Sequence, residues 1–141
     1  MRLDFLLGDY FSIDVKSPSV SGVTDSQFQA AMKCGNFAGT VDAWVEPDEV
    51  KGFIASLKQL NQTLRGEATL TSDDGGRTLA IEMFPTDQLG HFLLRVKMGK
   101  DYAIHHNVYE TQAVGVFPFE TQALASICEH FEEAVTGHSD A

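Results

Sequence analysis

His105, His106 and Asn107 form the most conspicuous polar group in this sequence. Histidine titrates near neutral pH and is the side chain most often used for acid–base catalysis. In a strand, however, neighbouring side chains point to opposite faces, and no sequence motif of a catalytic nucleophile accompanies the pair. We therefore expect His105 and His106 to lie in a loop without a catalytic role, and His91, which follows Gly90, to be hydrogen-bonded within a turn.

Metal and phosphate sites lack the residues that they would need. Cys128 and His130 stand two positions apart in a predicted helix, so their side chains point to different sides, and Cys34 stands alone. Neither cysteine belongs to a CxxC pair, which predicts two free, buried thiols. Lys100 follows Gly99, but the earlier glycine and the following Ser or Thr of a Walker A motif are missing. We expect no catalytic residue, no metal, no cofactor and no enzymatic activity.

Two segments have the apolar spacing of amphipathic helices. The first starts at Pro47, a residue that suits a first helical position, and ends before Gly66. Its apolar stripe consists of Val50, Phe53, Ile54, Leu57, Leu60 and Leu64. The second helix follows Pro118 and is expected to stop at Gly137. Its stripe consists of Leu124, Ile127, Cys128, Phe131 and Val135.

Other parts of the chain alternate apolar and polar residues with the period of β-strands. The alternating segments are 11–15, 28–33, 37–45, 67–71, 78–83, 91–98 and a last strand within 108–117. Cys34-Gly35-Asn36 predicts a hairpin turn, and Asp73-Asp74-Gly75-Gly76 is the strongest turn signal of the chain. Short turns between successive strands predict antiparallel pairing.

These elements predict an α+β fold, with an antiparallel β-sheet of about six to eight strands and two α-helices packed on one face. The 141 residues fit a single domain. Within it, residues 1–26 are expected to contribute N-terminal strands and a loop, and residues 137–141 a frayed tail.

The sheet face that the helices leave uncovered is the candidate binding surface. It combines carboxylates with an aromatic anchor, Trp44. Tryptophan is enriched at binding hot spots, and carboxylates attract basic partners. The alternative interpretation is a solvated face with cross-strand ion pairs. The candidate partner-binding residues are Asp42, Trp44, Glu67, Glu82, Phe84 and Arg95.

The charge balance restricts the class of partner. With 20 acidic and 10 basic residues, the formal net charge is −10, which argues against a protein that mainly binds nucleic-acid phosphates. Asp4 and Asp9 interrupt the apolar residues near the N-terminus, and no apolar run approaches the length of a membrane span. We expect a cytoplasmic protein that has neither nucleic acid nor a membrane as its partner.

Four motifs follow one another between about residues 27 and 135. They are Gly35-Asn36-Phe37-Ala38-Gly39 before a strand, the helix from Asp48 to Leu64 closed by Gly66-Glu67-Ala68, then Leu89-Gly90-His91-Phe92, and finally Gly115-Val116-Phe117-Pro118-Phe119-Glu120-Thr121 before the last helix. In this order the motifs resemble the WapI-type immunity proteins and related bacterial families of unknown function. Residues 1–26 lie outside the resemblance.

The resemblance implies a bacterial cytoplasmic protein that binds and blocks a toxin domain delivered by a neighbouring cell. The toxin of the WapI-type family is a nuclease that cleaves transfer RNA. The resemblance also implies a compact α+β domain without catalytic residues. Because a nuclease presents a basic groove to RNA, an acidic protein would be steered towards it. The expected partner is therefore a basic protein such as a toxin domain.

The residues leave two other functions open. Exposed aromatic side chains on an uncovered sheet face also occur in homodimers, so a self-associating scaffold is one alternative. The other is a small-ligand-binding domain with a pocket lined by His91, His105 and His106.

Overall fold

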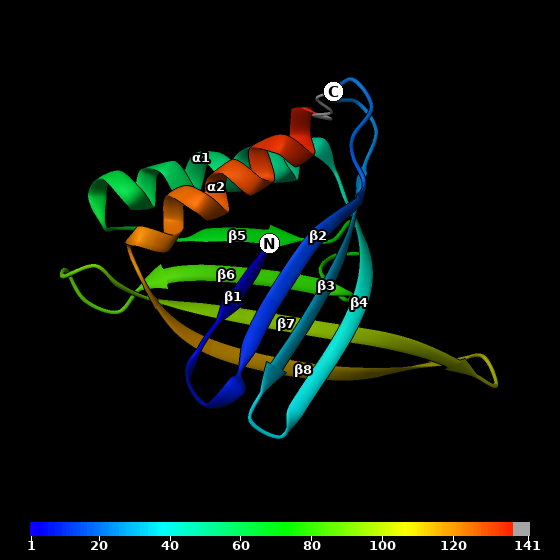
Figure 1. The fold of residues 1–141 in the computed structure, drawn as a ribbon. Helices are drawn as coiled ribbons and strands as arrows, with labels where there is room; N and C mark the ends of the chain where they lie inside the picture. The colour runs from blue at the N-terminus through cyan, green and yellow to red at the C-terminus, as the bar shows by residue number, and fades with distance from the viewer. Residues whose placement is uncertain (137–141) are drawn as a thin grey trace.

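A computed structural model describes residues 1–136 and contains, within them, eight strands, one 3-10 helix and two α-helices (Figure 1). In chain order these are β1 (Arg2–Asp4), η1 (Leu6–Gly8), β2 (Tyr10–Ser17), β3 (Ser26–Cys34), β4 (Phe37–Val45), α1 (Pro47–Thr63), β5 (Ala68–Thr71), β6 (Leu79–Pro85), β7 (His91–Ile104), β8 (Asn107–Glu120) and α2 (Gln122–Thr136). The predicted α+β class and antiparallel pairing are confirmed. The predicted stop at Gly137 and the tail at 137–141 lie outside the described residues.

The strands form two four-stranded sheets rather than one layer. Sheet A has the order β1-β2-β3-β4, sheet B has the order β5-β6-β7-β8, and α1 connects them. Figure 1 shows the strands of sheet A running steeply across those of sheet B. The alternation of apolar and polar residues indicates that each strand buries one face. The same alternation arises whether the strands share one sheet or belong to two.

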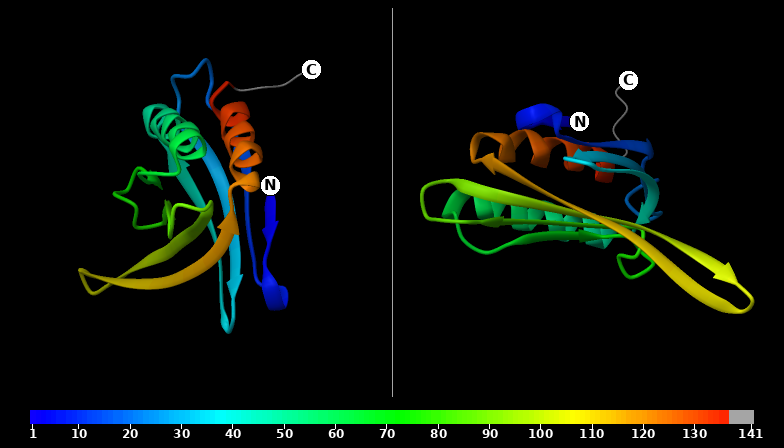
Figure 2. Two further views of the ribbon diagram at one scale, coloured as in Figure 1. Left: turned by 90° about the vertical axis from the view of Figure 1, so that its left-hand side faces the viewer. Right: turned by 90° about the horizontal axis from the view of Figure 1, so that it is seen from below.

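The core lies between the inner faces of the two sheets and the two helices. Figure 2 shows the helices side by side at one end of the molecule, in agreement with their packing on the same side. Phe131 of α2 packs edge-on against Phe53 of α1, with ring centroids 4.9 Å apart, and lies 5.6 Å from the ring of Phe28 in β3. The buried side chains of α1 match its predicted stripe: Val50, Phe53, Ile54, Leu57 and Leu60.

Gly115 of β8 allows the two sheets to approach each other where they cross. A Cβ atom at this position would lie 2.9 Å from Sδ of Met32 in β3 and 3.0 Å from the ring of Phe117. Beside it, Cys34 donates a 3.6 Å hydrogen bond from Sγ to the carbonyl of Val116. Both cysteines are free, as predicted, but only Cys128 is buried, whereas Cys34 is half-buried.

The N-terminal segment belongs to sheet A. Leu3 of β1 lies opposite Phe11 of β2, and Ile13 of β2 lies opposite Ala30 of β3. Residues 1–26 thus contain β1, η1, β2 and the segment that leads to β3. This arrangement places η1 at the turn between β1 and β2, beside the hairpin turn at Gly35, whose amide donates to the side chain of Asp9.

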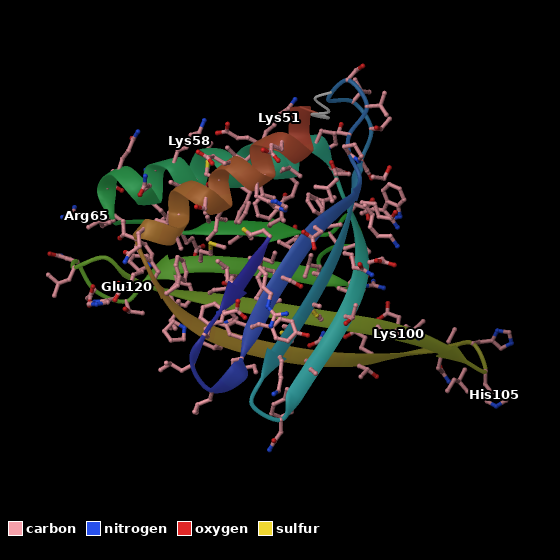
Figure 3. The ribbon with its side chains drawn as sticks, viewed as in Figure 1. Lys51, Lys58, Arg65, Lys100, His105 and Glu120 are labelled. Carbon is pink, nitrogen blue, oxygen red and sulfur yellow. The ribbon has the colours of Figure 1, made fainter. Side chains whose placement is uncertain are left out.

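The β7–β8 hairpin extends beyond the rest of sheet B. Its strands are longer than predicted, and Figure 3 shows the tip at His105 projecting away from the molecule. His105 and His106 form a two-residue turn with φ angles of 51° and 69°. Positive φ at both positions matches the twist of a tight hairpin. The prediction that this pair lies in a loop is confirmed.

Candidate functional site

The six predicted partner-binding residues do not lie on one face. Asp42 and Trp44 are on the outer face of β4 in sheet A, whereas Glu82, Phe84 and Arg95 belong to β6 and β7 of sheet B. Glu67 is exposed immediately before β5. The expectation of one continuous face was wrong because it assumed a single sheet.

The three residues of sheet B interact with one another. Glu82 and Arg95 are direct cross-strand partners, and Arg95 Nη1 lies 3.3 Å from Glu82 Oε1. The guanidinium carbon of Arg95 lies 5.2 Å from the centroid of the Phe84 ring. This geometry matches the alternative interpretation, a solvated face with a cross-strand ion pair.

Trp44 lies at the end of β4, where sheet A meets the turn between β5 and β6. Its side chain is 46% exposed, a large apolar area for a surface position. Its carbonyl accepts a 2.9 Å hydrogen bond from the amide of Asp73. Two residues earlier on the same face, Asp42 forms an ion pair of 3.3 Å with Lys16 of β2.

Three further carboxylates surround the end of β4. Asp25 directly precedes β3 and Glu46 directly follows β4, so the two residues flank the terminal pair of the β3–β4 ladder, Ser26 opposite Val45. The pKa of Asp73 is raised, chiefly by a hydrogen bond with the Asp25 side chain, then by burial and by neighbouring negative charges. Negative potential is therefore concentrated here.

We call this surface the acidic end and define it by Asp25, Asp42, Trp44, Glu46 and Asp73. Of these, Asp42 and Trp44 were predicted from the sequence, whereas Asp25, Glu46 and Asp73 were not predicted as site residues. The Asp73-Asp74 pair was recognised only as part of a turn. Its position against Trp44 depends on how the two sheets meet, which residue spacing does not encode.

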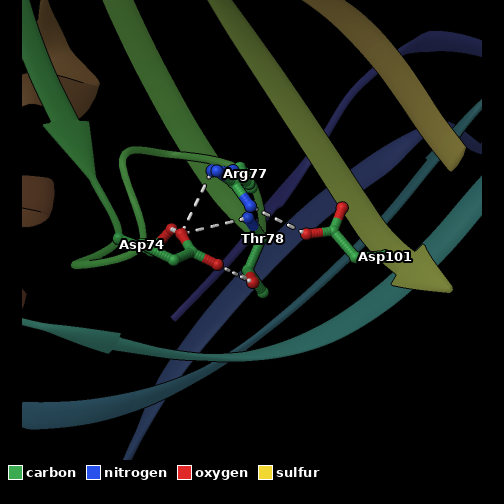
Figure 4. A network of polar contacts seen from close by, with 5 residues as sticks. Asp74, Arg77, Thr78 and Asp101 are labelled. Atoms are coloured by element: carbon green, nitrogen blue, oxygen red, sulfur yellow. Dashed lines mark hydrogen bonds and ion pairs between the residues drawn. The ribbon is translucent and has the colours of Figure 1, made fainter. Parts of the chain in front are cut away.

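Asp74 organises the turn that carries Asp73 (Figure 4). Its Oδ1 accepts hydrogen bonds from the Arg77 amide at 3.1 Å and the Thr78 amide at 3.3 Å, and the Ser72 and Thr78 hydroxyls also donate to its carboxylate. Burial tends to raise the pKa of Asp74, but these hydrogen bonds outweigh it and hold the pKa below its ordinary value. The ionised carboxylate therefore fixes the conformation of the turn.

A polar hollow of about 470 Å³ adjoins the acidic end. Asp42, Asp74, Asp101, Arg77 and Lys100 contribute charged groups to it, and Arg77 Nη1 lies 3.3 Å from Asp101 Oδ2 (Figure 4). The hollow therefore carries charges of both signs. Within residues 1–136, no group of three or more His, Cys, Asp or Glu side chains is arranged to hold a metal ion.

The predicted pocket lined by three histidines does not exist. His91 and the His105–His106 pair stand at opposite ends of the 14-residue strand β7. At about 3.3 Å per residue, they are about 45 Å apart. His91 Nδ1 lies 2.7 Å from Asp87 Oδ2, which confirms a hydrogen-bonded turn histidine, and this hydrogen bond raises the pKa of His91.

No family model, curated protein or solved structure matches this chain. The resemblance to WapI-type immunity proteins therefore stays a prediction. Neither helix of the described region has the length and apolarity needed to cross a bilayer.

Proposed function

We propose that this protein is a binding protein of the immunity type, which blocks a basic protein partner such as a toxin domain through the acidic end. The observation that carries the proposal is the position of half-exposed Trp44 among the carboxylates of Asp25, Asp42, Glu46 and Asp73. The proposal assigns the protein no catalytic step and places it in the bacterial cytoplasm.

The chemistry of the acidic end suits a basic partner. A tryptophan side chain buries a large area at low entropic cost, and a lysine or arginine of the partner would find both a ring face and carboxylates nearby. Asp25 and Asp73 repel each other when both are ionised, which supports the binding of a cation between them. The net charge of −10 would also accelerate association with a basic surface.

The test is binding of the product of the neighbouring gene, measured by isothermal titration calorimetry. Trp44→Ala and the double variant Asp25→Asn/Asp73→Asn should each weaken binding by at least about tenfold. Glu82→Gln is the matched control, because its carboxylate pairs with Arg95 on sheet B, away from the acidic end. Equal losses for the acidic-end variants and the control, or no binding at low salt, would refute the proposal.

Self-association is a second candidate function. Val114 and Val116 are 48% and 44% exposed on β8, and β8 is an edge strand of sheet B. An apolar strand edge is a surface on which a second copy can pair. Light scattering tests this candidate, since a strictly monomeric mass at high concentration would exclude it.

A further inference from the structure

An apolar groove of about 770 Å³ lies between η1 and the adjoining ends of β7 and β8. It is separate from the acidic end. Trp44 pairs with Gln27 at the start of β3, whereas Tyr10, which follows η1, pairs with Lys33 at the other end of β3. The inference drawn from this groove does not depend on the function proposed for the acidic end.

The groove is lined by four phenylalanine rings arranged in two stacked pairs. The centroids of Phe5 and Phe117 are 4.7 Å apart, and those of Phe92 and Phe119 are 5.4 Å apart. Phe92 and Phe117 belong to the buried core, which holds the outer rings of Phe5 and Phe119 in place. The groove is therefore prearranged to accept apolar side chains.

Two leucines stand exposed on the η1 side of the groove. Leu6 is 83% exposed and Leu7 is 98% exposed, and Leu7 has a left-handed backbone with φ of 61°. The turn is held by hydrogen bonds from the Phe5 amide to the Asp9 carbonyl, from the Asp9 amide to the Leu6 carbonyl, and from the Gly35 amide to the Asp9 side chain. The fold thus fixes Leu7 in a conformation that is unfavourable for leucine and leaves both side chains uncovered.

The charged groups around the groove are mainly acidic. Asp4, Asp9, Glu120 and His91 line it, and none of its described lining residues is lysine or arginine. The Gly35 amide donates a hydrogen bond to Asp9 and the Gln122 side-chain amide donates one to Glu120, and neither donor carries a charge. Glu120 also interacts electrostatically with His91, its cross-strand partner. Carboxylates beside an apolar floor favour a ligand that combines apolar and cationic groups.

Two cations lie nearby without lining the groove. Arg2 Nε forms an ion pair of 2.9 Å with Asp4 Oδ1, and Lys33 Nζ would lie 3.9 Å from a Cβ atom at Gly8. Together they do not balance the carboxylates of Asp4, Asp9, Asp87 and Glu120 in this region.

From this geometry we propose that the groove binds a short segment of a partner protein in which apolar side chains are flanked by lysine or arginine. The apolar side chains would pack on the stacked phenylalanine rings and against Leu6 and Leu7. The flanking cations would lie against Asp9 and Glu120. The charge of the groove makes a basic segment the preferred occupant over a neutral or acidic one.

The experiment measures the binding of three fluorescent octapeptides to the full chain by fluorescence anisotropy. The first has a leucine- and valine-rich centre flanked by lysines, the second has the same centre flanked by glutamates, and the third has the lysines with a serine centre. The first should bind at least about tenfold more tightly than either of the others. Equal binding of the first and third peptides would reduce the effect to charge alone and overturn the proposal.

Leu7→Asp and Leu89→Asp form a matched pair of variants for the same measurement. Both leucines are highly exposed, at 98% and 81%, and Leu89 does not line the groove. Each variant adds one negative charge, so attraction by charge alone would strengthen binding of the first peptide in both. The proposal requires at least about tenfold weaker binding for Leu7→Asp only. Unchanged or tighter binding by Leu7→Asp would overturn it.

Discussion

The amide of Asp73 donates a 2.9 Å hydrogen bond to the carbonyl of Trp44. This single contact ties the turn between β5 and β6, at the start of sheet B, to the last residues of β4 in sheet A. It brings the backbone of Asp73 to the backbone of Trp44, although 29 positions separate the two residues in the sequence. The stability of this turn therefore affects the surface that we propose as the binding site.

Replacement of Asp73 by asparagine should stabilise the fold at neutral pH. The raised pKa of Asp73 means that its ionised form is disfavoured in the folded state, mainly through its interaction with Asp25. The protonated carboxyl group of Asp73 contributes its full stability below pH 3.8, its pKa in the unfolded chain. This contribution is lost as the pH rises through the higher pKa of Asp73 in the folded protein. Urea unfolding of both proteins at several pH values should give a higher free energy of unfolding for Asp73→Asn at pH 7. This difference should disappear in acid. A loss of stability at pH 7 would contradict the repulsion between Asp25 and Asp73.

Asp74→Ala should destabilise the protein by about 1–2 kcal/mol, because hydrogen bonds from Ser72, Arg77 and Thr78 are lost at a partly exposed site. The pKa of Asp74 is lowered in the folded state, so its contribution is present above pH 3.8 and is lost as pH falls through the folded pKa. Chemical denaturation at pH 7 and in acid measures both effects. If the free energies of unfolding of the two proteins differed by the same amount at every pH, a role for the ionised carboxylate would be excluded.

His130 should make the fold sensitive to mild acid. Burial lowers its pKa, as does the nearby N-terminal ammonium group, and the opposing effects of Asp14, Glu133 and the Ile13 carbonyl do not reverse the shift. The Nε2 atom of His130 is buried and has no hydrogen-bond partner. The unfolded chain therefore takes up a proton near pH 6.5 before the folded chain does, and stability falls as pH decreases below this value.

Thermal unfolding of His130→Phe across the range from about pH 8 to pH 5 tests this sensitivity. The decrease in stability that begins near pH 6.5 in the parent protein should be absent from the His130→Phe variant. At the high end of the range His130 is uncharged in both the folded and the unfolded chain. A difference in stability between the two proteins there therefore measures the change in packing. Parallel curves for the two proteins would show that His130 does not contribute.

Leu7→Gly should stabilise the fold while it weakens binding in the groove. Leucine at φ of 61° is strained, and glycine adopts this conformation freely, although it also gains entropy in the unfolded chain. The net gain should be up to about 1 kcal/mol. Because Leu7 is 98% exposed, no packing is lost. Equilibrium unfolding measures the gain, and a clear destabilisation would mean that the Leu7 side chain supports the fold itself.

The helices and most strand positions follow from local chemistry. Pro47 starts α1, and the spacing of Val50, Phe53, Leu57 and Leu60 gives one buried stripe. Alternation identifies β2 to β8 because each strand has one inner and one outer face. These features depend on near neighbours in the chain, so their spacing in the sequence is sufficient to predict them.

The division into two sheets depends on contacts between distant residues. Gly115 must lie over Met32, and the Asp73 amide must reach Trp44, for the sheets to cross as they do. Neither pairing changes the local pattern of either segment. For the same reason, the sequence identified Trp44 as an exposed anchor but grouped it with Glu82 and Arg95, which belong to the other sheet.

The most direct test of the account is to map the contact surface by NMR amide shifts as the product of the neighbouring gene is added to the labelled protein. Our account predicts the largest changes at Asp25, Trp44 and Asp73, together with the indole signal of Trp44. Changes centred instead on Glu82 and Arg95, with the acidic end unaffected at saturation, would contradict it.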